Sequence, residues 1–338
     1  MPNVNQDLSV SNAWLIYLNA QRHLPIKVIH TDKAKQKIVY QHPGLSFDSY
    51  DSFGLPSLFN LIYLNNALYF YTFTQPYDDQ GNMFYFDMAN YLQNMGITFF
   101  AASLHLLCYK ELYDINVSKW NLTIEIQSFA KSTKNLSFKC NFLSNDQKLL
   151  LASAIVSICP VQTAQKKRAP IDEELGKFCP ENTTYSSHQV LDVPKPQDAY
   201  CVSSRVGYHE TDSHHHMASM SYYNHVIDAI YSAVVKGCVF EHLTRERFQR
   251  GVSSFEMVHL KECLMDDLLD VFVWEIPNHD MRYRQKLKDV FISPFSRDQV
   301  DDKLHIETFD PETDGSVIMC VVEVRGKPCL RAIVQFFN

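Results

Sequence analysis

Three consecutive histidines follow an acid and precede a stretch with helical spacing of apolar residues. In "YHETDSHHHMASMSYYNHVIDAI", residues 208–230, Asp212 lies two residues before His214 and four before His216. A carboxylate and imidazoles at the start of a helix are groups that can activate water and orient a carbonyl compound. The segment is therefore a candidate wall of an active site, in which His215 is expected to face solvent.

The first turn of the helix after His216 offers a second chemical element. The backbone N–H groups near Met217, Ala218 and Ser219 are expected to leave the helix end with the positive dipole behind them. Such donors suit the negative charge that develops on a carbonyl oxygen, so they form a candidate oxyanion site. Asp212 has a structural alternative here as the helix N-cap or its neighbour.

Glu262 and Cys263 are candidates from a later strand, expected over 255–264. If its even face wraps the helix, Glu262 lies beside Val258 and Leu260, and desolvation raises its pKa toward that of a useful base. If not, Glu262 lies at a solvated strand end. Successive strand residues face opposite ways, so Cys263 cannot line the same groove. We expect Glu262 with a water nucleophile, and Cys263 as a packed thiol rather than the nucleophile.

A metal site is not expected. A set made of His209, Asp212, His214 and His216 is disfavoured, because adjacent residues rarely converge on one ion and no second ligand group has standard spacing. The nine Cys contain no CxxC pair, which favours reduced, mostly buried thiols. We therefore expect neither a metal nor another cofactor.

Composition excludes several classes of protein. The 338 residues carry a formal net charge of −7, which argues against a nucleic-acid partner. The longest apolar stretch, residues 96–109, is too short to span a bilayer. The first ten residues contain neither a charged region nor an apolar core, so no secretory signal is visible and a cytoplasmic protein is expected.

The elements that must position these residues occur twice. In the helix expected over 57–73, Leu58, Leu61, Leu64, Leu68 and Tyr71 follow helical spacing. In the helix expected over 217–236, Met220, Tyr223, Ile227, Ile230 and Val234 do so. A strand-like segment precedes each helix, at 45–53 and 200–210. Runs rich in β-forming residues follow each helix and predict an antiparallel meander.

This order of elements indicates a duplication. Asp51-Ser52 and Asp212-Ser213 are 161 residues apart, about one domain length. One long helix wrapped by an antiparallel sheet is the plan of the hotdog fold, so an α+β double hotdog is predicted. We expect an N-terminal extension over 1–40, a first hotdog over 41–163, a linker over 164–198 and a catalytic hotdog over 199–338.

Three stretches resemble the plant-type acyl-acyl-carrier-protein thioesterases, which are double hotdogs. They are "YHETDSHHHMASMSYYNHVIDA", "KEC" at 261–263 and "ASAIVSICPVQTAQKKRAPIDEEL" at 152–175. The resemblance implies catalytic roles for Asp212, His216 and Glu262. His214 stands where the family has an Asn. In the first copy, Gly54 and Leu55 are taken to match His214 and His216, so that copy is expected to house the acyl chain.

The resemblance implies a thioesterase that acts on a fatty acyl or related thioester of CoA or of an acyl carrier protein. The change from Asn to His214 leaves two alternatives open. One is a hotdog that binds an acyl or polyketide-like ligand without hydrolysing it, and the other is a hotdog hydro-lyase. Chain length is not predicted, and a homodimer is left open.

Overall fold

The computed structural model describes residues 26–32, 36–46, 49–74, 94–144, 149–165, 167–177, 193–212, 215–237, 239–276 and 316–338. The first copy contains β1 (Lys27–Asp32), β2 (Lys37–Gly44), α2 (Leu58–Thr74), β3 (Ile97–Cys108), α4 (Lys110–Tyr113), β4 (Trp120–Lys131), β5 (Leu136–Leu143) and β6 (Leu150–Gln162). Two short elements follow, β7 (Lys167–Arg168) and α5 (Glu173–Gly176). The second copy contains β8 (Tyr200–Arg205), the 3-10 turn η2 (Tyr208–Glu210), α6 (Ser219–Lys236), α7 (Arg245–Phe248), β9 (Val252–His259), β10 (Leu268–Glu275), β11 (Val317–Val324) and β12 (Lys327–Phe336).

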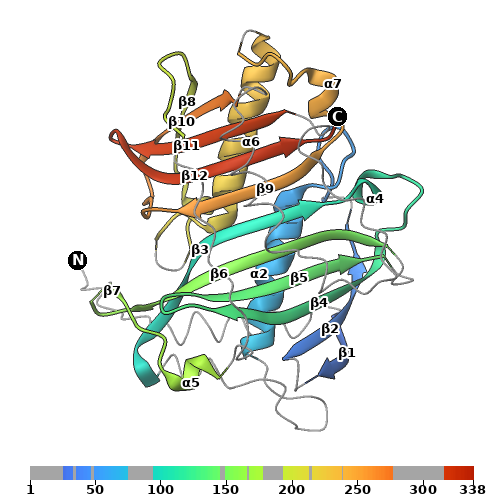
Figure 1. Ribbon diagram of the computed structural model, residues 1–338, viewed down its shortest axis with the longest axis vertical. Helices are drawn as coiled ribbons and strands as arrows, with labels where there is room; N and C mark the ends of the chain where they lie inside the picture. The colour runs from blue at the N-terminus through green and yellow to red at the C-terminus, as the bar shows by residue number, and fades with distance from the viewer. Residues whose placement is uncertain are drawn as a thin grey trace, which may run out of the picture.

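The strands form one continuous sheet in the order β1-β2-β4-β5-β6-β3-β9-β12-β11-β10-β8 (Figure 1). Each copy follows the same path: an outer strand (β2 or β8), the long helix, a strand at the seam (β3 or β9), and then a meander that begins beside the outer strand and ends beside the seam strand. Antiparallel pairing of β3 with β9, from Ser103↔Val258 to Leu107↔Ser254, joins the copies edge to edge. The prediction of a double hotdog is confirmed.

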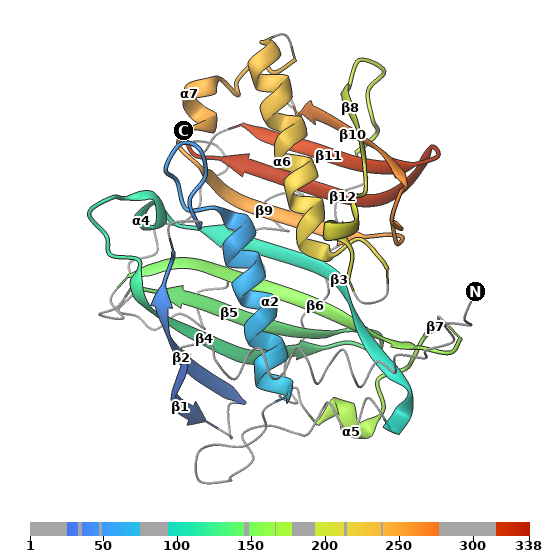
Figure 2. The same cartoon turned by 180° about the vertical axis from the view of Figure 1, so that it is seen from behind.

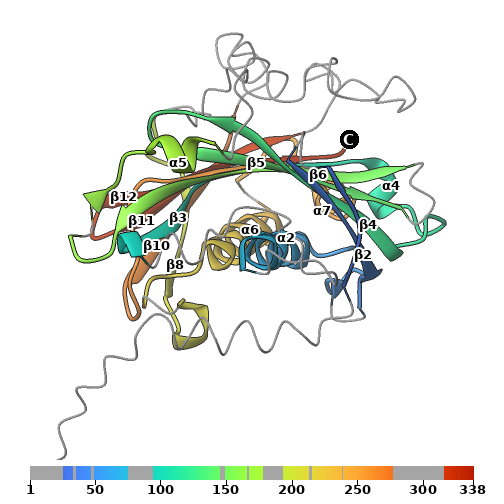
Figure 3. The same ribbon diagram turned by 90° about the horizontal axis from the view of Figure 1, so that it is seen from below.

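Both long helices lie on the same side of the sheet (Figure 2). Viewed from below, the sheet arches over α2 and α6, which lie next to each other in its concave face (Figure 3). A helix that packs on a sheet and also against a neighbouring helix buries more than one face. In α6 the fully buried positions accordingly include Tyr222, Val226 and Ala229 as well as Ile230 from the predicted stripe.

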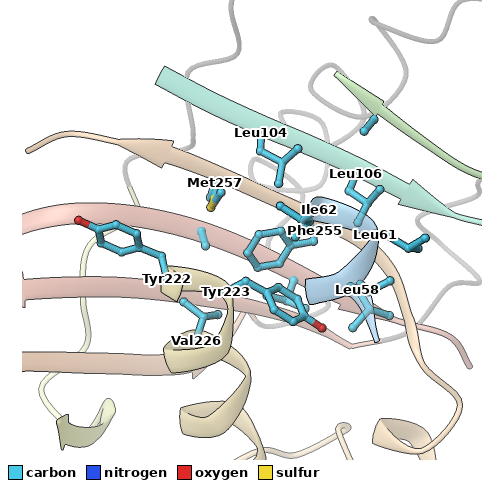
Figure 4. Packing of buried hydrophobic residues seen from close by; sticks show 14 of the residues in the cluster. Leu58, Leu61, Ile62, Leu104, Leu106, Tyr222, Tyr223, Val226, Phe255 and Met257 are labelled. Carbon is cyan, nitrogen blue, oxygen red and sulfur yellow. The ribbon is translucent and has the colours of Figure 1, made fainter. Parts of the chain in front are cut away.

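The shared core lies where the two helices meet the seam strands (Figure 4). Leu58 and Leu61 of α2 are 2% and 1% exposed, and Phe255 of β9 packs edge-to-face on Tyr223 at 5.0 Å between ring centroids. Each buried leucine contributes about 1.5–3 kcal/mol to folding. The two copies therefore share one core, which fixes the start of α6 relative to β3.

The expectation of an extension over residues 1–40 is wrong for its last part. β1 and β2 are strands of the sheet, and Ile38 and Tyr40 are each 1% exposed in the core. β1 is the edge strand of the sheet and β2 is its neighbour. The exposed and half-buried positions of β1 explain the mixed polarity of its sequence. The strand expected at 45–53 is also wrong, because the described residues among them, 45, 46 and 49–53, form no strand and lie between β2 and α2. Of the runs rich in β-forming residues after the second helix, the part over 303–315 lies outside the described residues.

Candidate functional site

A cavity of about 860 Å³ opens at the junction of the two copies. The first copy contributes side chains of α2, of the start of β3, and of β5 and β6. The second copy contributes the turn before α6, the first turn of α6, the segment after β9 and the turn between β11 and β12. Asp212, His216 and Glu262 all line this cavity, so the structure brings together three of the residues singled out from the sequence.

Asp212 organises the turn that leads into α6. Its backbone N–H donates to the carbonyl oxygen of His216 at 2.8 Å, and the His216 N–H donates back to Asp212 Oδ1 at 3.1 Å. His215 lies inside this turn with φ +61°, a left-handed conformation that few residues other than glycine adopt. Its side chain is exposed. The Asp212 carboxylate thus holds the backbone of His216 in place.

The first copy contains the same turn, 161 residues earlier. The Asp51 N–H donates to the carbonyl oxygen of Leu55 at 2.8 Å, and the Leu55 N–H donates to Asp51 Oδ1 at 3.0 Å. Gly54 occupies the left-handed position with φ +75°. Gly54 therefore matches His215, and the expected match to His214 is wrong by one residue. A turn present in both copies is part of the fold as well as of the site.

His216 lies between the two copies. Its side chain is 11% exposed, and its Nε2 lies 3.4 Å from Glu262 Oε2. The ring of Phe100, on β3 of the first copy, packs on the imidazole with centroids 5.5 Å apart. Packing from Phe100 and the carboxylate of Glu262 together orient the imidazole toward the cavity.

Glu262 reaches the cavity by a route that the sequence prediction missed. The odd face of β9 packs into the core through Phe255 and Met257, so the even face does not wrap the helix. β9 ends at His259, and the N–H groups of Leu260 and Lys261 both donate to the carbonyl oxygen of Cys329. This bulge-like pairing breaks the alternation of the strand. The Glu262 side chain is 51% exposed, so the expected desolvation is wrong as well.

Cys263 lies beneath the site rather than in it. It is 0% exposed, and the Tyr222 hydroxyl accepts a hydrogen bond from its N–H at 3.2 Å. A hydrogen bond with Cys329 and burial raise the pKa of the Cys263 thiol. A buried thiol with a raised pKa is a poor nucleophile.

The expected oxyanion site is only partly available. The Met217 N–H donates to the carbonyl oxygen of Cys263 at 2.8 Å, and the Ala218 N–H donates to that of Glu210 at 2.7 Å. Both groups are therefore used by the fold. The N–H groups of Ser219 and Met220, at the start of α6, have no hydrogen-bond partner among the described residues. Of the three predicted positions, Ser219 alone keeps a free donor at the cavity.

Ser219 also takes part in a pair that the sequence analysis missed. Its Oγ lies 2.8 Å from His259 Nε2, and both residues line the cavity. The His259 ring packs edge-to-face on Tyr222 at 5.0 Å. Burial lowers the pKa of His259 to about 4, so the imidazole is neutral near pH 7. Forty residues separate the two partners, and no spacing rule connects them.

His214 lies outside the described residues, so its place relative to His216 stays a prediction.

Within the described part of the chain, no group of three or more His, Cys, Asp or Glu side chains is arranged to hold a metal ion. None of the helices in that part combines the length and apolar character that crossing a membrane requires.

Three solved thioesterases share this arrangement of elements along most of the chain. A 12:0-ACP thioesterase from Umbellularia californica matches 89% of this chain and 97% of its own, with 13% identity and a TM-score of 0.58. A candidate oleoyl thioesterase from Lactobacillus plantarum matches 90% and 98%, with 10% identity and a TM-score of 0.63. An acyl-ACP thioesterase from Bacteroides thetaiotaomicron matches 90% of this chain and 100% of its own, with 12% identity and a TM-score of 0.55. The chain has the double hotdog fold.

No family model matches the sequence, and no curated protein does either. At 10–13% identity the structural likeness establishes the fold alone, since one fold hosts many functions. Function has to be argued from the residues around the double hotdog's cavity.

Proposed function

We propose that the protein is an acyl thioesterase, with one working site where α6 begins. The observation that carries the proposal is the pairing of His216 with Glu262 on the wall of a cavity shared by both copies. A carboxylate beside an imidazole can activate water. The equivalent turn of the first copy carries Gly54 and Leu55 and has no such pair. Among the described residues the proposed site is therefore single.

In this mechanism Glu262 accepts a proton from a water molecule, and the water oxygen attacks the thioester carbon. His216 orients the water and the carbonyl group, and the N–H of Ser219 stabilises the negative charge on the carbonyl oxygen. The C–S bond then breaks, and the proton passes to the leaving sulfur. Asp212 acts as a positioning residue, because its carboxylate binds the backbone N–H of His216.

The acyl chain occupies the part of the cavity inside the first copy. Its lining there is mostly apolar, with Phe138, Val156 and Ile158 on the sheet and Tyr63 on α2. Such a lining suits a hydrocarbon chain.

The carrier binds at the exposed edge of the cavity. Four exposed cationic residues line this edge: Arg168, Lys261, Arg325 and Lys327. CoA and acyl carrier proteins both present a phosphopantetheine arm, and cationic side chains suit its phosphate. Location in the cytoplasm, expected from the sequence, stays a prediction, and the question of a homodimer stays open.

Thiol release measured by a colorimetric assay tests the function. The purified protein is incubated with acyl-CoA esters of about 6 to about 18 carbons, a range chosen to span the cavity. It is also incubated with acyl carrier protein charged with the same chains. Release that depends on Glu262 supports hydrolysis. Tight binding of these esters without thiol release would instead favour the non-hydrolytic binding protein, and a change in absorbance of an enoyl thioester would favour the hydro-lyase.

A further inference from the structure

The Ser219–His259 pair has no counterpart in the first copy. The backbone hydrogen bonds of the two turns superimpose with an offset of 161 residues, which matches Ser219 with Leu58. Leu58 is 2% exposed and belongs to the core. A leucine at this position is therefore compatible with the fold, so the fold itself does not require the hydroxyl of Ser219.

The chemistry of the pair distinguishes two roles for Ser219. In a nucleophilic role, His259 would have to take the hydroxyl proton, and a base works best when its pKa lies near the working pH. Burial lowers the pKa of His259 to about 4, and no carboxylate of the described residues lies against the imidazole to raise it. A neutral His259 that donates from Nε2 to Ser219 Oγ instead leaves the hydroxyl proton of Ser219 for another acceptor.

We propose that Ser219 is a catalytic residue whose hydroxyl donates a hydrogen bond to the carbonyl oxygen of the bound thioester, with His259 as the positioning residue that orients it. The inference rests on the proposed function. The hydroxyl and the free N–H of Ser219 belong to the same residue at the cavity wall. Together they supply two hydrogen-bond donors to the carbonyl oxygen. These replace the backbone N–H donors that Met217 and Ala218 were expected to provide.

Ser219→Val and Ser219→Thr form a matched test, because the two side chains have nearly the same shape and only threonine carries a hydroxyl. Removing one oxyanion donor costs about 10²–10³ in kcat. We expect that loss for Ser219→Val with little change in KM, and for Ser219→Thr a kcat within about tenfold of the wild type. Equal activity of the two variants would overturn the proposal.

Binding separates this inference from the proposed function. The probes are an acyl-CoA analogue in which a methylene replaces the sulfur but the carbonyl remains, and a second analogue that lacks the carbonyl. Ser219→Val should weaken binding of the first probe by about 3- to 10-fold, as expected for one neutral hydrogen bond, and leave the second unchanged. This comparison holds even if the wild-type protein releases no thiol, which would refute the proposed function. Equal binding of the first probe by Ser219→Val and Ser219→Thr would refute the role of the hydroxyl.

His259 is tested through the pH dependence of kcat/KM. His259→Gln retains a donor near Ser219 Oγ, whereas His259→Phe retains the ring against Tyr222 without the donor. We expect His259→Gln to be more active than His259→Phe. The acidic limb of its kcat/KM profile should lie at the same pH as in the wild type. A limb that disappears in both variants, or an acyl group trapped on Ser219, would make the pair a base and a nucleophile and overturn the assignment.

Discussion

The Nε2 atom of His216 lies 3.4 Å from Oε2 of Glu262, although the two residues reach the cavity from separate segments of the second copy. His216 is held by the turn before α6, and Glu262 by the segment that follows β9. Neither segment is regular secondary structure at these residues. The rigid sheet and α6 position them, which is how binding and catalytic residues on loops are commonly held.

Glu262→Gln tests the base. The amide keeps the shape of the side chain and its contact with His216 but cannot accept a proton from water. We expect kcat to fall by about 10²–10⁴ while KM changes little. Steady-state kinetics of thiol release measure both constants. A fully active Glu262→Gln enzyme would move the base to another residue, with His214 and Asp212 as the next candidates.

Cys263→Ser tests the competing nucleophile. The Cys263 thiol is 0% exposed, so we expect kcat to stay within about threefold of the wild type, since no step of the mechanism uses this group. Reaction with iodoacetamide should leave Cys263 unmodified in the folded enzyme, as peptide mass spectrometry can measure. Burst kinetics with an acyl group on Cys263 would contradict the water mechanism.

The turn before α6 gives a prediction with an internal control. Asn can accept the His216 N–H as Asp does, so we expect Asp212→Asn to keep most of the activity and Asp212→Ala to lose at least about tenfold through a displaced His216. Asp51→Ala removes the same hydrogen bond in the first copy and should leave kcat near the wild-type value. An inactive Asp212→Asn would give the carboxylate a direct role in catalysis.

Periodicity and internal repetition carried the prediction of the fold. The two helices and the repeated Asp-Ser pair indicated a duplication, and the structure places Asp51 and Asp212 in the same hydrogen-bonded turn. β1 and β2 escaped detection, because β1 has no buried position and the buried residues Ile38, Val39 and Tyr40 of β2 are consecutive. Neither strand therefore shows the alternation that predicts a half-buried strand. The fold was thus predictable where patterns repeat over a whole element.

The fine geometry of the site was less predictable. The register error at Glu262 arose because both the Leu260 and Lys261 N–H groups donate to Cys329, a residue about 70 positions later in the chain. The Ser219–His259 pair depends on how α6 meets the end of β9. Such contacts follow from tertiary packing, which local sequence patterns do not record.

Filling the cavity inside the first copy should change the choice of acyl chain. Val156 is 5% exposed and lines the cavity on β6. The larger ring in Val156→Phe takes up space that the end of a long chain would occupy, so we expect kcat/KM for the longest accepted chain to fall at least about tenfold and that for shorter chains to change little. The panel of acyl-CoA esters measures this shift. A uniform loss at every length would indicate damage to the fold instead, and the melting temperature serves as the control.

Glu256 gives a prediction for stability. It lies on β9 at the seam, directly opposite His105 of β3. Its side chain is 0% exposed, and neither carboxylate oxygen has a hydrogen-bond partner among the described residues. Burial raises the pKa of Glu256 from 4.5 to about 8. Between these values the folded chain keeps a proton that the unfolded chain has lost, so the free energy of unfolding falls as the pH rises, by up to about 1.4 kcal/mol per pH unit.

Glu256→Gln removes this titration. Relative to the wild type, the variant should gain stability steadily from about pH 5 to about pH 8, because only the wild type must ionise a buried carboxyl in that range, and the difference should level off above it. Urea unfolding of both proteins across this range gives the two free energies. Glu173→Gln, at an exposed position of α5, is the control and should show a flat difference. A flat difference for Glu256→Gln as well would mean that the folded chain ionises Glu256 at the same pH as the unfolded chain.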